Sequence, residues 1–94
     1  MATEGYQEPV NELPTRPRDM HRAMVPLMEE LEAVDGYNQR VEACKDEELT
    51  LIFQHNADEE NEHAAMVLEW IRRRKPVLDK ELRDWLFTDK KLDH

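Results

Sequence analysis

Apolar side chains recur along this chain at alternating spacings of three and four residues, which is the period of one face of a helix. The first stripe predicts a helix over about residues 19–44 and consists of Met20, Ala23, Leu27, Glu30, Val34, Tyr37, Val41 and Cys44. The second predicts a helix over about residues 47–74 and consists of Leu49, Phe53, Asn56, Glu60, His63, Val67 and Trp70. A shorter apolar pattern predicts a third helix over residues 77–87. Together they predict an all-α fold.

Residues at the ends of the second predicted helix support its boundaries, whereas two residues within the first predicted helix are unfavourable in a helix. Asp46 is a suitable N-cap for the second helix, and Pro76 follows its basic last turn as a breaker. Pro26 has no amide to bond the carbonyl of residue 22, so we expect it to kink the first helix or delay its start. Gly36 costs roughly 1 kcal/mol relative to alanine inside a helix. No turn residues flank Gly36, so one continuous helix is predicted.

The predicted helices divide the chain into three parts. Residues 1–18 carry three prolines and a glycine, which predicts an extended N-terminal arm. Residues 19–88 form a single helical domain, and residues 89–94 form a frayed polar tail. The two long helices are joined by about three residues, so they must be antiparallel neighbours. One such hairpin cannot bury its own stripes, and we expect two chains to associate into a four-helix bundle.

Composition narrows the classes of partner. The chain has 22 acidic and 13 basic residues, which gives a net charge of −9. This charge argues against nucleic acid and anionic membranes, which reward clustered lysine and arginine, and it suits cation binding. The single cysteine, Cys44, rules out an internal disulfide and most thiolate metal sites. Because residues 1–17 lack the apolar core of a secretory signal, we expect a soluble protein of a reducing compartment.

Three ionisable residues lie inside the apolar stripes, where a charge is costly unless it is paired or bound to a metal. Glu30 lies in the first stripe, and Glu60 and His63 form a Glu-x-x-His pair in the second. Carboxylate oxygen and imidazole nitrogen suit iron, manganese or zinc. Ferritin-like carboxylate sites use one Glu from each of two helices and a Glu-x-x-His from each of the other two. This chain holds half of that set, so a two-fold dimer would complete a di-metal site.

Other interpretations of the same residues remain open. A lone Glu-x-x-His pair often marks a solvated helix face, and polar residues at a helix seam can fix the register of a non-catalytic dimerisation or scaffold protein. Tyr37 can be a core aromatic instead of a participant in redox chemistry. A di-iron peroxidase or oxygenase is a third possibility, which would need an apolar substrate pocket beside the metals.

Two long segments of the sequence closely resemble the encapsulated ferritins. The segments are Met-Glu-Glu-Leu-Glu-Ala-Val-Asp-Gly-Tyr-Asn-Gln-Arg at residues 28–40 and His-Asn-Ala-Asp-Glu-Glu-Asn-Glu-His-Ala-Ala-Met-Val-Leu-Glu-Trp at residues 55–70. Residues 86–88, Leu-Phe-Thr, are similar to the third helix of that family. The resemblance covers about residues 20–88.

The resemblance implies a helical hairpin whose ferroxidase centre forms only between two chains. It implies that such dimers assemble into an open ring of ten subunits, carried in the cytoplasm as cargo inside an encapsulin nanocompartment. Iron would be oxidised by dioxygen at the ring and stored by the shell. By position, the iron ligands would be Glu30, Glu60 and His63 of each chain, with Tyr37 beside the centre. Glu29 and Glu32 match acidic residues that line the family's iron access route.

The sequence departs from the family pattern in two places. Gly36 stands where the family has a tryptophan before the tyrosine, which leaves a gap in the wall near the centre. The Gly- and Leu-containing cargo peptide of many relatives is not found before His94. Either a longer chain carries that peptide, or recruitment to a shell uses another surface.

Overall fold

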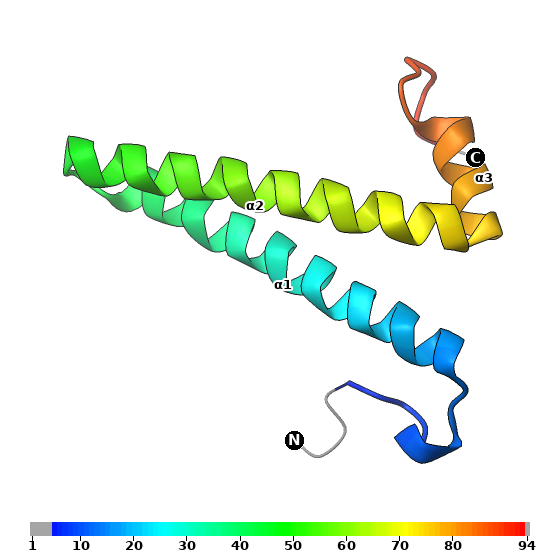
Figure 1. The fold of residues 1–94 in the computed structure, drawn as a ribbon. Coiled ribbons are helices and arrows are strands. Elements are labelled where there is room, and N and C mark those ends of the chain that lie inside the picture. The colour runs from blue at the N-terminus through cyan, green and yellow to red at the C-terminus, as the bar shows by residue number, and fades with distance from the viewer. Residues whose placement is uncertain (1–4, 94) are drawn as a thin grey trace.

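The computed structural model describes residues 5–93, and in that range every regular element is a helix (Figure 1). A short 3-10 helix, Val10–Glu12, precedes α1 (Thr15–Ala43), α2 (Glu47–Arg74) and α3 (Pro76–Trp85). α1 and α2 form an antiparallel hairpin, and α3 turns away from the end of α2. The predicted fold, a two-helix hairpin with a short third helix, is confirmed. No helix of residues 5–93 is both long and apolar enough to cross a membrane.

α1 begins at Thr15, four residues before the predicted start. Pro17 lies in its first turn, where backbone amides have no partner inside the helix, so a proline there removes no hydrogen bond. The helix then continues through Pro26 and Gly36 to Ala43. The expectation that Pro26 delays the start of the helix is therefore wrong, and residues 15–18, which were predicted to be extended, are helical.

α2 has the predicted bounds, and its start is fixed by a cap. The Leu49 amide donates to Asp46 Oδ1 at 2.9 Å, as expected for an N-cap aspartate. α3 is shorter than predicted, because the chain is extended at Leu86 and left-handed at Phe87, with a φ of 58°. That conformation costs a bulky residue of the order of 1–3 kcal/mol, and it ends the helix before the predicted residues 86 and 87.

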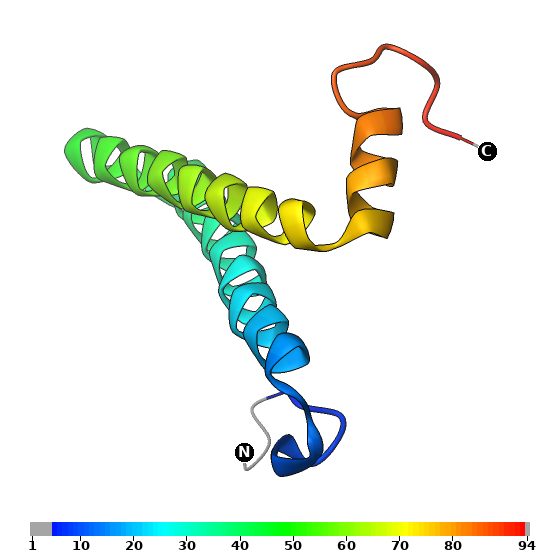
Figure 2. The same cartoon turned by 45° about the vertical axis from the view of Figure 1, so that its right-hand side comes forward.

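The hairpin buries few side chains by itself. Among the described residues the buried apolar side chains are Ala57, Ala64 and Ile71, spaced by seven along the face of α2 that meets α1. Large apolar side chains such as Met28, at 60% exposed, remain in solvent. Figures 1 and 2 show α1 and α2 close together at their connection and diverging toward the start of α1. A single chain therefore leaves large apolar side chains of both α1 and α2 exposed to solvent.

An ion-pair network connects α2 to α3. Arg72 of α2 donates from Nε and Nη2 to the carboxylate of Glu69, at 2.6 and 2.7 Å, and its Nη1 pairs with Asp79 of α3. Arg83 donates from Nε to Asp79 Oδ1 at 2.9 Å. The hydrogen bonds from Arg72 and then Arg73 lower the pKa of Glu69 to about 2. The hydrogen bond from Arg72 likewise lowers the pKa of Asp79. The α2–α3 junction therefore stays ionised at neutral pH.

Candidate metal centre

Glu60 and His63 lie one turn apart in the middle of α2, in the register that the sequence predicts. Glu60 Oε1 and His63 Nδ1 are 3.6 Å apart, and the side chains are 27% and 46% exposed. This distance is longer than the donor–acceptor distance of a normal hydrogen bond. It suits two donors to one transition-metal ion, since each donor would lie about 2.0–2.2 Å from the metal. The pair is thus partly accessible and geometrically able to hold a cation.

Two buried side-chain atoms of α1 lack a hydrogen-bond partner among the described residues, Glu30 Oε2 and Arg18 Nε, and only the first belongs to a candidate ligand. Leaving a buried acceptor unsatisfied costs about 1–3 kcal/mol, and more when the group is charged. Buried polar atoms without partners are rare and point to a proton, an ion or a partner molecule that completes them. Glu30 therefore has a buried carboxylate oxygen that no described residue satisfies.

The structure does not bring the three predicted ligands of one chain into a single cluster. Within residues 5–93, no group of three or more His, Cys, Asp or Glu side chains is close enough together to hold a metal ion. One chain thus offers the Glu60–His63 pair on α2 and a separate carboxylate on α1. Assignment of Glu30, Glu60 and His63 as ligands of one centre remains a prediction that requires a second chain.

The face of α2 that carries His63 also exposes large apolar side chains. Ile52 and Met66 are 53% and 66% exposed. Met66 is three residues after His63, and Ile52 is eleven before it, so all three share one helical stripe. Trp70, four residues after Met66, extends the stripe and is partly exposed. This mixture of donors and uncovered apolar groups is typical of an interface.

Tyr37 lies where α1 meets α2, and two side chains lie near its ring. The ring centroid is 6.1 Å from that of Phe53 on α2. The Arg40 guanidinium carbon lies 5.2 Å from the Tyr37 centroid. Sequence reasoning did not single out Arg40, although its positions three residues after Tyr37 and four after Gly36 place it on the same side of α1.

Glu29 and Glu32 are exposed and line a surface hollow of about 550 Å³ on α1. Gly36 and Tyr37 also line this hollow. A Cβ added at Gly36 would meet Arg40 Nη1 at 3.6 Å, an ordinary van der Waals contact. The two glutamates and the predicted gap at Gly36 therefore belong to one surface feature, beside Tyr37.

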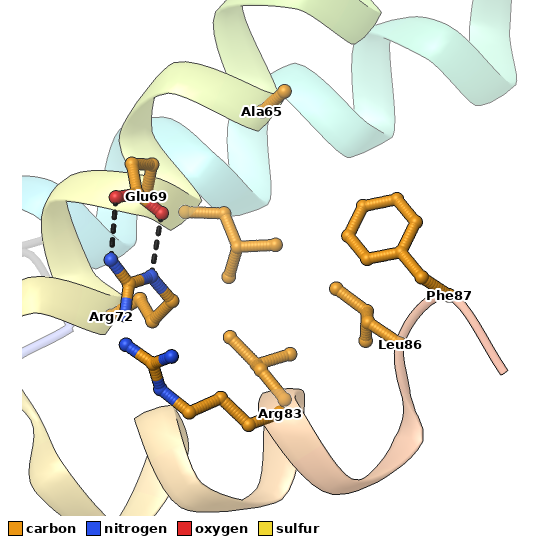
Figure 3. Close-up of a pocket in the computed structure, with 8 residues that line it drawn as sticks. Ala65, Glu69, Arg72, Arg83, Leu86 and Phe87 are labelled. Carbon is orange, nitrogen blue, oxygen red and sulfur yellow. Dashed lines mark hydrogen bonds and ion pairs between the residues drawn. The ribbon is translucent and has the colours of Figure 1, made fainter.

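A larger apolar groove of about 670 Å³ lies between α2 and α3, away from these residues (Figure 3). Leu82, Leu86 and Phe87 line one side of it, and its carboxylate, Glu69, is already paired with Arg72. None of the predicted ligands lines the groove. It is therefore not the apolar substrate pocket that a di-iron oxygenase would need beside its metals.

Comparison with known proteins places these features in a family. Residues 5–89 match the EncFtn-like family. A ferritin-like protein from Thermotoga maritima is 55% identical over 87 residues, which is 93% of this chain and 76% of that protein. An encapsulated ferritin-like protein from Rhodospirillum rubrum is 55% identical over 88 residues, 94% of this chain and 63% of that protein.

A solved crystal structure of a protein from Nitrosomonas europaea has the same fold. It is 66% identical in sequence and superposes with a TM-score of 0.93, covering 96% of this chain and 99% of that chain. The family match spans the hairpin, α3 and both segments that carry the candidate ligands. The chain belongs to the EncFtn-like family of encapsulated ferritin-like proteins.

Proposed function

We propose that the protein is a ferroxidase that oxidises Fe(II) to Fe(III) with dioxygen at a di-iron centre shared by two chains. The observation that carries the proposal is the unpartnered, buried Oε2 of Glu30 in the middle of the predicted stripe. In the dimer, the Glu30 carboxylates of the two chains would be shared ligands of a pair of iron ions, and Glu60 and His63 of each chain would be its other ligands. Two ferrous ions give one electron each to dioxygen, which takes up two protons and leaves as hydrogen peroxide.

A two-fold homodimer supplies both the missing ligands and the missing core. In such an interface the same surface of each chain is used, so every donor appears twice. The exposed Ile52 and Met66 on the His63 stripe support burial of this surface against a second chain. Tyr37 lies beside the centre as a redox-active or hydrogen-bonding neighbour, and its packing against Phe53 holds the ring in place.

We further propose that the dimers join into a ring of ten subunits that serves as cargo of an encapsulin shell in the cytoplasm. A ring needs a second interface on each chain. Support comes from a second apolar surface, the α2–α3 groove with Leu86 at 42% and Phe87 at 104% exposure. The name of the Rhodospirillum rubrum relative supports encapsulation. In this assembly Glu29 and Glu32 line the access route of iron.

The proposal is tested by adding Fe(II) under air to purified protein and following ferric absorbance. We expect Glu30→Ala, Glu60→Ala and His63→Ala each to slow oxidation by more than about tenfold, because each change removes two ligands per centre. The matched control is His55→Ala, which removes an exposed α2 histidine paired with Glu59 at 2.7 Å. Circular dichroism checks that helix content is unchanged.

The outcomes separate the alternatives. A scaffold protein gives no ferric absorbance above the protein-free control. A di-iron peroxidase reacts faster with hydrogen peroxide than with dioxygen. Full activity in two of the three ligand variants shows that the ligands are wrongly assigned, and a folded monomer that oxidises iron refutes a shared centre.

A further inference from the structure

The basic residues of this acidic chain gather at the open end of the hairpin, where α1 begins and α2 ends (Figure 1). Residues 15–22 and 70–75 together hold seven arginine and lysine residues and one aspartate. Residues 23–69, which form the rest of the hairpin, hold 13 acidic and two basic residues. An anion is therefore repelled by most of the hairpin and attracted to its open end.

One hollow at this end lies between the two long helices. Its volume is about 330 Å³, and it is lined by Arg16 from the first turn of α1 and by Trp70 and Arg74 from the last turns of α2. Asp19 and Met20 of α1 also line it. This volume is at the lower end of the range of small-molecule sites. The hollow thus offers two guanidinium groups, one from each helix, to a small ligand.

Arg74 is held in place without a carboxylate. Its guanidinium carbon lies 4.0 Å from the Trp70 ring centroid, and its Nη1 donates to the Trp70 carbonyl oxygen at 3.2 Å. A guanidinium stacked on a ring keeps its planar edge, with its remaining N–H donors, free for an oxyanion. Arg74 is therefore oriented before any ligand binds.

Neighbouring arginines are ion-paired, whereas the two that line the hollow are not. The paired ones are Arg22 with Asp19, and Arg72 and Arg73 with Glu69. Within the part of the chain that the structure describes, Arg16 and Arg74 form no ion pair. Two like charges at one hollow repel each other, and an anion between them replaces that repulsion by attraction.

Asp19 gives the hollow one hydrogen-bond acceptor. Its Oδ1 accepts from Arg22 Nη1 at 3.0 Å, and its Oδ2 has no hydrogen bond to a described residue. A carboxylate repels most anions, but it can accept the proton that hydrogen phosphate carries at neutral pH. Sulfate carries no such proton. Two arginine donors and one carboxylate acceptor therefore suit phosphate better than sulfate or chloride.

We propose that the open end of the hairpin binds inorganic phosphate, with Arg16 and Arg74 as donors to its oxygens and Asp19 as acceptor of its proton. This inference goes beyond the proposed function and does not depend on iron oxidation. Bound phosphate contacts both helices. It therefore links the start of α1 to the end of α2, where Figures 1 and 2 show the two helices diverging.

Isothermal titration calorimetry with sodium phosphate tests the site on the metal-free protein, at pH 7 and fixed ionic strength. We expect saturable binding that Arg16→Gln and Arg74→Gln each weaken by about tenfold or more, because each change removes a charge-assisted hydrogen bond. The matched control is Arg73→Gln, which changes the net charge equally. Arg73 pairs with Glu69 and does not line the hollow, so the phosphate affinity of this variant stays within about twofold of the parent.

Two further measurements test the link between the helices and the role of Asp19. Phosphate should raise the Tm of the parent above its value in chloride of equal ionic strength, and it should not raise the Tm of Arg74→Gln. The parent should bind sulfate at least about fivefold more weakly than phosphate, and Asp19→Asn should bind the two within about twofold of each other, because the acceptor of the phosphate proton is lost.

The inference is overturned if the parent binds no phosphate, if Arg73→Gln loses as much affinity as Arg74→Gln, or if the parent binds sulfate as tightly as phosphate. Circular dichroism of each variant checks that a loss of binding is not a loss of helix. Phosphate binding by a protein that oxidises no iron leaves this inference standing while the proposed function fails.

Discussion

Replacing Glu30 by methionine is expected to stabilise the metal-free protein while removing iron oxidation. Glu30 Oε2 is buried without a hydrogen-bond partner, and an unsatisfied buried acceptor costs about 1–3 kcal/mol. Methionine has similar length and helix propensity, fills the same space and buries no charge. Taking the lower end of that range, the free energy of unfolding rises by about 1 kcal/mol. For a domain of this size, that raises Tm by roughly 4–8 °C.

The assay is thermal unfolding at one protein concentration in the presence of a chelator, followed by circular dichroism. Glu29→Met is the matched control, because Glu29 is the neighbouring glutamate and is exposed, so its Tm should move by no more than about 1–2 °C. Fe(II) oxidation is measured on the same samples. A Glu30→Met protein that melts at or below the parental Tm refutes the reasoning, because Glu30 would then contribute favourable interactions without metal. Retained oxidation would remove Glu30 from the centre.

Three further predictions follow from the site and the α2–α3 junction. Glu29→Ala and Glu32→Ala should raise the Fe(II) concentration for half-maximal oxidation and weaken its dependence on ionic strength; loss of all bound metal would make them ligands of the centre instead. Gly36→Ala should raise the free energy of unfolding by about 0.5–1 kcal/mol, since the added Cβ meets Arg40 only at contact distance, and a lower Tm would contradict this. Glu69→Gln should lower Tm at pH 7. The pKa of Glu69 in the folded protein is about 2, below its ordinary value of 4.5. The difference in Tm between the parent and Glu69→Gln should therefore persist down to about pH 4.5 and vanish toward pH 2. A pH-independent difference in Tm would exclude the ion pairs with Arg72 as its source.

The sequence predicts those helix ends that are set by local chemistry and misses those set elsewhere. Asp46 caps the start of α2, and Pro76, which has no amide hydrogen, follows its end. Both signals can be recognised in the sequence. The predicted start of α1 is four residues too late, because a proline such as Pro17 usually interrupts a helix. In the first turn Pro17 removes no hydrogen bond, so the helix includes it. The predicted end of α3 is too late, because the spacing of apolar residues does not reveal that the backbone of Phe87 is left-handed.

For the candidate site, periodicity predicts which face each residue occupies but not the distances between faces. Glu60 and His63 lie one turn apart on α2, with Glu60 Oε1 and His63 Nδ1 3.6 Å apart, and their role as ligands stays a prediction. The prediction that Glu30 shares a metal centre with Glu60 and His63 requires a second chain. The spacing of residues along one helix does not show where a second chain would lie. The sequence does not point to Arg40, because a charged residue on a polar face ordinarily extends into solvent, whereas its guanidinium carbon lies 5.2 Å from the Tyr37 ring centroid.

If the proposed donor set is divided between two chains, the number of iron centres depends on the protein concentration. Within residues 5–93 of one chain no three candidate ligands lie together, so a newly made, unpaired chain holds no complete site of the proposed kind. The number of complete sites then grows with the square of the concentration of unpaired chains. Under the proposed shared centre, dilute chains oxidise little iron and release little hydrogen peroxide. Oxidation then rises steeply as chains accumulate and pair.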